Sequence, residues 1–204
     1  KKKNRGRNFG HIKGVETVKK IVSASIKFKI PIITFYVFSS ENWKRPKNEI
    51  SYLFTLIKNY FLNEIDRVKS QGIKINIIGN LNQLPSDLRR ILYKTIDSTK
   101  KNKVITVNLA INYGSKNEIT MASKKTKKKV SIKNIEKNLY TKNIPDPDIL
   151  IRTGNTKRLS NFLLWQLAYT EIYFEKKLWP DFNKNDFCKI LKKFKITKRN
   201  YGNI

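Results

Sequence analysis

Residues 32–46 read IITFYVFSSENWKRP, and this stretch decides the fold. Its first seven residues are mostly β-branched or aromatic, a composition typical of a strand buried on both faces. The rest of the stretch is mostly polar, and over residues 47–70 the apolar side chains fall on one helical stripe. Further runs of this kind occur at residues 73–78, 104–110, 149–151 and 171–174, and we interpret all of them as strands buried on both faces. A second amphipathic helix is predicted over residues 86–99.

This alternation of strands and amphipathic helices predicts the α/β class, with a mainly parallel central sheet flanked by helices. Parallel strands need crossover connections, and the crossover helices bury the faces of the sheet. A chain of 204 residues is long enough for one well-buried core, so we expect a single domain over residues 1–204. Ligands of such sheets bind beyond the carboxyl ends of the strands, which directs attention to the loops after residues 38 and 151.

The formal charge of +29 results from 44 Lys and Arg residues against 15 Asp and Glu residues. Such a chain attracts polyanions, and a nucleic-acid-binding protein is one hypothesis for it. Lys accompanies abundant Asn and Ile throughout, which favours compositional bias over a binding face, and no known nucleic-acid signature occurs. The single Cys188 suits a reducing compartment, and no apolar run approaches the ~20 residues of a membrane span. We therefore expect a cytoplasmic protein with no specific nucleic-acid partner.

The loop after residue 38 is dense in hydrogen-bonding side chains. Helix capping explains Pro46 in the first turn of the next helix, but it does not explain two serines, a carboxylate, an amide, an indole and a guanidinium. We therefore interpret this loop as functional. Its candidate residues are Ser39, Ser40, Glu41, Asn42, Trp43 and Arg45.

The loop after residue 151 combines a strand end, basic side chains and a glycine. It contains Arg152, Gly154, Arg158 and Ser160, and we interpret the apolar residues 162–168 as the start of a helix. Guanidinium groups bind phosphate oxygens in bidentate fashion and helix N-termini favour anions, so this pattern predicts a diphosphate site. The Gly-Lys-Ser/Thr order of a P-loop is absent, so nucleotide hydrolysis is not indicated.

Arg7 and His11 stand just before a predicted helix that runs from Val15 through Ile26. A lone histidine is more often a cap or a packing residue than a catalyst. Its position beside Arg7 at a helix start keeps His11 as a candidate phosphate ligand or proton carrier.

Several long motifs, in order along the chain, resemble the cis-prenyltransferase family, typified by bacterial undecaprenyl diphosphate synthase. The two loops carry the closest similarity, and it extends through residues 10–14, 108–114, 169–174 and 178–182. The resemblance implies an enzyme that condenses an allylic diphosphate, such as farnesyl diphosphate, with isopentenyl diphosphate in cis geometry. The reaction would release diphosphate with the assistance of Mg²⁺.

The resemblance also implies roles for individual residues. The allylic diphosphate would be held by Arg7, His11 and Arg45. Isopentenyl diphosphate would be held by Arg152, Arg158 and Ser160, with Leu159 between the last two. The substrate-binding loop would include Ser39, Ser40, Glu41 and Trp43, in which Trp43 either packs over the substrate or anchors the loop.

Two further roles concern the chemistry. Asn42 matches the family's proton acceptor, and because a neutral amide is a poor base, we assign it to orienting the substrate or relaying the proton. Glu171 would be the magnesium carboxylate, since a hard oxygen ligand suits this cation. The apolar stripes of residues 50–68 and 88–96 would wall an apolar tunnel for the growing chain between sheet and helices. A homodimer is implied, and the product would be delivered to a membrane, with the protein peripheral at its surface.

The chain departs from the family pattern in places. The family's opening Asp-Gly-Asn motif, whose Asp is a magnesium and catalytic carboxylate, would precede Lys1, so we expect an N-terminally truncated domain with little or no turnover. Gly154-Asn155-Thr156 stands where the family usually has Gly-Gly-Glu, and residues 199–203 match its C-terminal motif with one Arg lost. The alternative is a non-catalytic partner subunit of this family, which the intact loop over residues 39–45 disfavours.

Overall fold

Three parallel strands form the central sheet, in the order β1-β3-β2. They are β1 (Ile32–Ser39), β2 (Ile73–Ile78) and β3 (Ile105–Tyr113), and β3 lies in the middle because it pairs with both of the others. All of β3 except Thr106 is buried. The computed structural model describes residues 7–126 and 130–199, with side chains from residue 9 onward.

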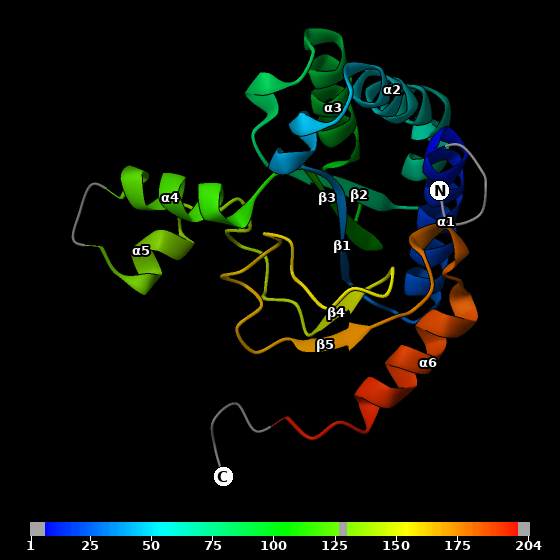
Figure 1. The fold of residues 1–204 in the computed structure, drawn as a ribbon, viewed down its shortest axis with the longest axis vertical. Helices are drawn as coiled ribbons and strands as arrows, with labels where there is room; N and C mark the ends of the chain where they lie inside the picture. Colours follow the sequence, from blue (N-terminus) through cyan, green and yellow to red (C-terminus); the bar gives the residue numbers. More distant parts are fainter. Residues whose placement is uncertain (1–6, 127–129, 200–204) are drawn as a thin grey trace.

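Helices flank the sheet and connect its parallel strands, as predicted for the α/β class (Figure 1). α2 (Lys47–Ser70) and α3 (Ser86–Thr99) pack on each other and against β2, with the bounds that the sequence predicted. α1 (Arg7–Lys27) contacts both α2 and α6 (Lys184–Lys195). α4 (Ser115–Lys125) and α5 (Ile132–Glu136) extend together to one side. Short 3₁₀ segments are η1 (Ser40–Lys44), η2 (Leu81–Gln83) and η3 (Trp179–Asp181).

β4 (Ile149–Arg152) and β5 (Glu171–Phe174) form a separate parallel pair. The mainly parallel sheet is therefore confirmed, but its five strands fall into two groups among the described residues. The prediction that every strand is buried on both faces is wrong for β5, whose Ile172 and Phe174 are exposed. A run of only three apolar residues after Glu171 does not distinguish burial on one face from burial on two.

Two predictions about helix ends are wrong. The first helix begins at Arg7, so His11 lies in its second turn rather than before it; Gly10 and Gly14, which are weak helix formers, concealed this start. Residues 162–168 form turns rather than a helix. Ser160, Asn161 and Leu163 have φ angles of 52°, 60° and 45°, and such left-handed residues do not continue into a right-handed helix. The loop after β4 therefore offers no helix N-terminus to an anion.

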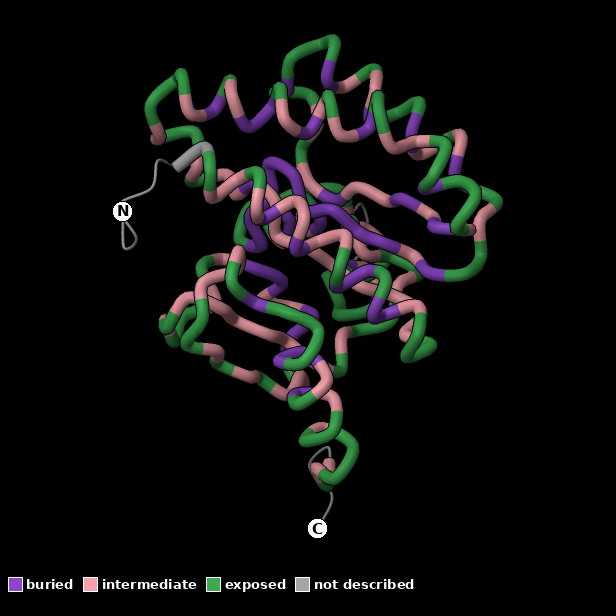
Figure 2. Tube along the Cα trace, turned by 90° about the vertical axis from the view of Figure 1, so that its right-hand side faces the viewer, coloured by how far each residue is buried: buried purple, intermediate pink, exposed green. Residues whose placement is uncertain are grey.

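The main core lies between the sheet and the pair α2 and α3. Figure 2 shows buried positions on the helix sides that face the strands. The apolar stripes predicted for the two helices supply much of this cluster, with Ile57 and Phe61 from α2 and Leu88 and Leu92 from α3. Within residues 7–126 and 130–199, none of the helices has the length and apolar character that crossing a bilayer requires.

Replacing Leu92 by alanine is expected to lower the free energy of unfolding by about 2–5 kcal/mol, because a fully buried side chain leaves a cavity. The matched control is Leu62→Ala on α2, a residue that is 57% exposed, with an expected loss below about 1 kcal/mol. Denaturant unfolding followed by circular dichroism measures both values. Equal losses would contradict this assignment of the core.

Candidate functional site

The loop after β1 is held together by its own side chains. The Ser39 amide donates to Asn42 Oδ1 (3.2 Å), and Ser40 Oγ donates to Glu41 Oε2 (3.2 Å). The amide oxygen of Asn42 thus stabilises the first turn of η1. The Nδ2 group of Asn42 takes no part in this hydrogen bond.

Trp43 anchors this loop to the ends of the neighbouring strands. Its Nε1 donates to Asn112 Oδ1 (2.8 Å), and its ring packs edge-on against Phe38 and Phe54. Asn112 in turn donates from Nδ2 to the carbonyl of Asn80 after β2 (2.7 Å). Of the two roles considered for Trp43, these contacts support anchoring of the loop.

The loop after β4 meets the loop after β1 at Asn161. Its Nδ2 donates to Glu41 Oε1 (2.7 Å), while its Oδ1 accepts from the Lys116 amide (2.8 Å). A Cβ at Gly114 would lie less than 3.0 Å from both Ser40 Oγ and Asn161 Nδ2, so any other residue there would displace these two side chains. Loops that lie far apart in the sequence are therefore joined at one edge of the protein.

Arg152 and Arg158 form the basic centre of this edge. Burial and the nearby guanidinium of Arg158 both lower the pKa of Arg152, which means that the two like charges lie close enough to interact. Arg152 Nε donates to Thr156 Oγ1 (3.0 Å), which folds the loop back over the strand end. Two guanidinium groups that repel each other are stabilised by a dianion between them.

Tyr36, which the sequence analysis did not select, lies between the two loops. Its hydroxyl donates to the Tyr113 carbonyl (3.1 Å) and lies 3.4 Å from the Ser160 carbonyl, and its ring stacks on Phe162. Burial and the charge of Glu41 raise the pKa of Tyr36 to about 12, although Ser39 and Arg152 act in the opposite direction. The phenol therefore stays protonated at neutral pH and can donate but not act as a base.

A second basic group, beside the N-terminal half of α1, gathers around Glu49 of α2. Arg45 donates from NH1 to Glu49 Oε1 (3.1 Å), and His11 Nε2 lies 3.7 Å from the same oxygen. The structure thus brings His11 and Arg45 together at one carboxylate, while the side chain of Arg7 lies outside the described residues. The sequence analysis missed Glu49, which lies in the first turn of α2, four residues after Arg45.

The remaining candidates lie at different places. Leu159 packs against the small cluster around Phe162, and Ser160 is exposed. Glu171 pairs with Ile149, whereas Arg152 pairs with Phe174, so about 10 Å of strand separates the two side chains' positions. Over the part of the chain with described side chains, no three His, Cys, Asp or Glu side chains form a group that could hold a metal.

The buried carboxylate of Glu118 stabilises the segments on either side of the contact at Asn161. Glu118 is 2% exposed and accepts hydrogen bonds from Tyr113 OH, from the Tyr140 amide (2.7 Å) and from Gln166 Nε2 (3.2 Å). Burial and the Glu118 charge raise the pKa of Tyr113 well above its usual range. This network fixes the end of β3 against the turns of residues 162–168.

A basic depression lies between α1, α2 and α6, away from these loops. It has a volume of about 520 Å³ and is lined by Lys19, Lys20, Lys27, Arg67 and Lys184, among others. Lys19 and Arg67 are paired there with Glu64. In a chain with a charge of +29, lysines around a surface hollow do not single out a ligand.

Comparisons with known proteins agree with one another. Residues 1–202 match the family model described as undecaprenyl diphosphate synthase. The isoprenyl transferase of Rickettsia typhi is 41% identical over 98% of this chain and 90% of that protein. The isoprenyl transferase of Prochlorococcus marinus is 40% identical over 100% of this chain and 78% of that protein.

Solved structures give the same result. A probable undecaprenyl diphosphate synthase from Campylobacter jejuni superposes with a TM-score of 0.86 at 36% identity, covering 93% of this chain and 92% of that chain. Lavandulyl diphosphate synthase from Lavandula x intermedia, solved with dimethylallyl diphosphate, gives a TM-score of 0.92 at 30% identity. That alignment covers 98% of this chain and 91% of that chain.

Inorganic diphosphate is expected to raise the melting temperature, because it neutralises the repulsion between Arg152 and Arg158. The Arg158→Met variant should lose most of this shift, whereas Arg90→Met, at an exposed position on α3, should keep it. Differential scanning fluorimetry at increasing salt measures the effect, which should weaken as salt screens the charges. The same shift in both variants would show that diphosphate binds to general surface charge instead.

Proposed function

The chain belongs to the cis-prenyltransferase family, and from this premise we propose how its two basic groups bind and join two prenyl diphosphates. It is an isoprenyl transferase, an enzyme of prenyl chain condensation. The substrates proposed for it are isopentenyl diphosphate and an allylic diphosphate such as farnesyl diphosphate. The observation that carries the proposal is the joined edge of the two loops, where Asn161 connects the loop after β4, with Arg152 and Arg158, to Glu41 of the loop after β1.

Isopentenyl diphosphate is assigned to the loop after β4. Arg152 and Arg158 would neutralise its diphosphate, with the Ser160 hydroxyl as a donor and Leu159 as part of the supporting apolar cluster. The half-buried position of Arg152 strengthens this interaction, because water screens a buried charge less. The hydroxyl of Tyr36, which donates to the Tyr113 carbonyl, lies close to this group and stays neutral.

The allylic diphosphate is assigned to Arg7, His11 and Arg45. Support comes from the shared position of His11 and Arg45 at Glu49, which orients both side chains before substrate arrives. A diphosphate bound there would stand opposite the isopentenyl group across the loop of Ser39, Ser40 and Glu41. Fixed cations offset the repulsion between two polyanions and hold the reacting carbons in place.

In the proposed reaction, the allylic carbon–oxygen bond breaks and diphosphate leaves with the bonding electrons. The double bond of isopentenyl diphosphate supplies the electron pair of the new carbon–carbon bond. This leaves a carbocation at the inner carbon of the former double bond, and the carbon next to it loses a proton, so that the electron pair of that carbon–hydrogen bond forms the new double bond. Asn42 would orient this group through Nδ2, since its oxygen already accepts from Ser39, and the proton would pass to a diphosphate oxygen or to His11.

Mg²⁺ is the cofactor that family membership implies, with Glu171 as the proposed carboxylate. When bound, it would neutralise charge on the leaving diphosphate. The described side chains do not by themselves make a metal site, and Glu171 lies at the opposite end of the strand pair from Arg152. No step of the mechanism above is therefore assigned to the metal.

The growing chain is proposed to enter an apolar tunnel between the sheet and the pair α2 and α3. The apolar composition of these helices supports this, because each buried methylene of a prenyl chain contributes about 0.8 kcal/mol. In the structure the buried side chains of both helices pack against the sheet. A cytoplasmic location with peripheral contact to a membrane, to which the product is delivered, completes the proposal. We further propose that residues 1–204 act as one domain.

The Arg152→Met variant is expected to weaken the binding of isopentenyl diphosphate about 10- to 100-fold, because a charge-assisted hydrogen bond is lost. Calorimetry measures this binding, and incorporation of labelled isopentenyl diphosphate into chains started from farnesyl diphosphate with Mg²⁺ measures turnover. Arg90→Met serves as the control. Wild-type affinity in Arg152→Met would contradict the assignment, and tight binding of oligonucleotides in place of both substrates would favour a nucleic-acid-binding protein.

A homodimer is proposed through β5. Its side chains Ile172 and Phe174 are 39% and 45% exposed, and Tyr169 just before it is 66% exposed. In the described chain β5 pairs only with β4, so a second copy can cover its open edge.

The Ile172→Asp variant is expected to shift the protein from dimer to monomer, because a charge in an apolar interface stays unpaired. Ile196→Asp, at a residue that is 85% exposed beyond α6, is the matched control and should leave the assembly unchanged. Sedimentation velocity distinguishes the two states. A wild-type protein that sediments as a monomer, or an Ile172→Asp dimer, would argue against this interface.

A further inference from the structure

The segment of residues 175–182, here called the strap, carries none of the proposed substrate ligands, yet it contacts both halves of the site. It runs from the end of β5 through η3 to the start of α6 (Figure 1). Its residues 178–182 belong to a motif that the sequence analysis selected and that the proposed function leaves without a role.

At one end the strap forms backbone hydrogen bonds with the loop that follows β4. The Gly154 amide donates to the Lys177 carbonyl (2.7 Å), and the Asn155 amide donates to the Glu175 carbonyl (3.1 Å). The Glu175 amide donates to the Arg152 carbonyl (2.8 Å). Gly154 has a backbone φ of 91°, which residues with a side chain rarely adopt. The loop turns away from the strand at this glycine. The position of Arg152 and of the residues after it therefore depends on where Lys177 lies.

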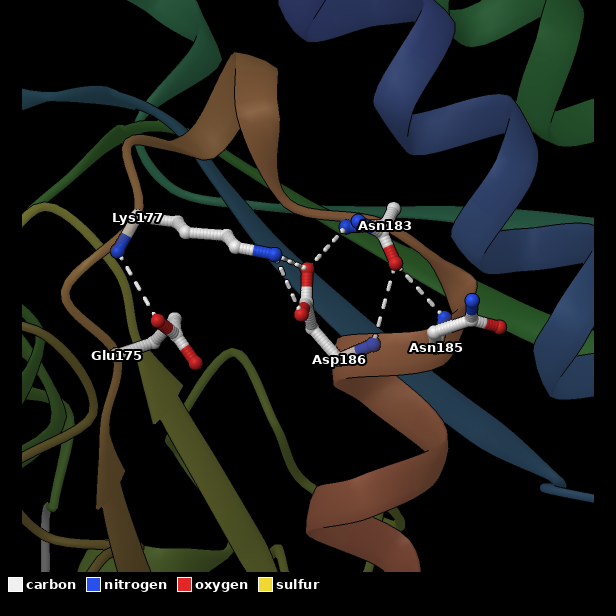
Figure 3. A network of polar contacts seen from close by, with 5 residues as sticks. All are labelled: Glu175, Lys177, Asn183, Asn185 and Asp186. Carbon is white, nitrogen blue, oxygen red and sulfur yellow. Dashed lines mark hydrogen bonds and ion pairs between the residues drawn. The ribbon is translucent and has the colours of Figure 1, made fainter.

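Lys177 is itself fixed to α6 (Figure 3). Its Nζ donates to both carboxylate oxygens of Asp186, at 2.7 and 2.8 Å, and its amide donates to Glu175 Oε1 (3.0 Å). Asp186 is 8% exposed and also accepts from the Asn183 amide (3.1 Å), while Asn183 Oδ1 caps the start of α6. Burial opposes the charged form of Asp186, but the hydrogen bonds from Lys177 and Asn183 leave its pKa below the usual value. The ion pair therefore persists at neutral pH.

At its other end the strap holds α1. Trp179 Nε1 donates to the Gly14 carbonyl (3.0 Å), and a Cβ at Gly14 would lie 3.3 Å from Trp179 Cδ1. Gly14 follows His11 by one turn of the helix. The ring of Trp179 is held between Phe35 of β1 and Phe182.

We propose that Lys177 and Asp186 are positioning residues for the diphosphate-binding loop: their ion pair fixes the Lys177 carbonyl, and this carbonyl holds the Gly154 amide and so presents Arg152 and Arg158. The inference rests on the proposed function for the identity of the diphosphate. The strap also sets the spacing between the two halves of the site, because the same segment holds α1 through Trp179.

The test compares Lys177→Met with wild type by hydrogen exchange and by calorimetry. The amides of Gly154 and Asn155 should exchange about five-fold faster in Lys177→Met, since a partly exposed ion pair stabilises by about 1 kcal/mol. The affinity for isopentenyl diphosphate should fall about as much, with the affinity for farnesyl diphosphate unchanged. Lys177→Arg, which keeps the cation, should restore both values.

Two further variants make the result specific. Lys58→Met removes a similar ion pair, Lys58 with Asp87 (2.8 Å) between α2 and α3, and should change neither value. Trp179→Phe removes the hydrogen bond to Gly14 but keeps an aromatic ring, and should weaken binding of farnesyl diphosphate only. If Lys177→Met folds poorly, Asp186→Asn replaces it, because the amide oxygen can still accept from Asn183.

Unchanged exchange at Gly154 and Asn155 in a folded Lys177→Met protein would overturn the inference. An equal change in Lys58→Met would do the same, because the effect would then be one of general stability. Failure of wild type to bind isopentenyl diphosphate would instead refute the proposed function. The exchange of the two amides would in that case still decide whether the ion pair positions the loop.

Discussion

The contact of Asn161 with the segments that follow β1 and β3 is the constraint on which the candidate site depends. The carboxyl ends of β1 and β3 lie at one edge because these strands are parallel neighbours, but β4 belongs to a separate pair. No sheet hydrogen bond among the described residues therefore joins the loop after β4 to the loop after β1. Asn161 makes that connection through Glu41 and the Lys116 amide, and Gly114 makes it possible by leaving space. Without this joint the basic residues of the second loop would not face the first.

The basic group of His11 and Arg45 includes a carboxylate, and this arrangement has a physical reason. Glu49 accepts from Arg45 and lies near His11, whereas Glu41 accepts from Asn161 beside Tyr36. Cations without such partners would repel one another and move apart in the free protein. A carboxylate orients them in advance, and a substrate with more negative charge then competes for the same groups. The tyrosine between the loops stays neutral because burial and Glu41 both oppose its ionisation.

The sequence predicted the regular elements well because their signals are local. α2, α3, β2 and β5 have the predicted bounds, and hydrophobic periodicity is sufficient to find such elements. The turns of residues 162–168 were mistaken for a helix, since their apolar composition resembles one. Three residues with left-handed backbone angles decide the conformation there, and their cause lies in contacts with distant segments such as Ser115, whose Oγ accepts from the Leu164 amide (2.9 Å).

Within the site, the sequence analysis selected the basic residues of both loops but missed Glu49, which accepts from Arg45, and Tyr36, which lies between the loops. Arg152 and Arg158 could be selected from the composition of their loop. In the sequence Tyr36 is one aromatic residue of a strand, and only the fold shows that it lies close to Arg152. The charge of +29 did not help, because lysines spread over the surface are solvated and screened. Partial burial beside a second guanidinium group is what makes Arg152 different from the exposed cations. A half-buried guanidinium group next to a second one has lost part of its hydration and is repelled by its neighbour. A bound anion offsets both of these free-energy costs, and it does so more strongly here than at an exposed cation, because water screens the interaction less.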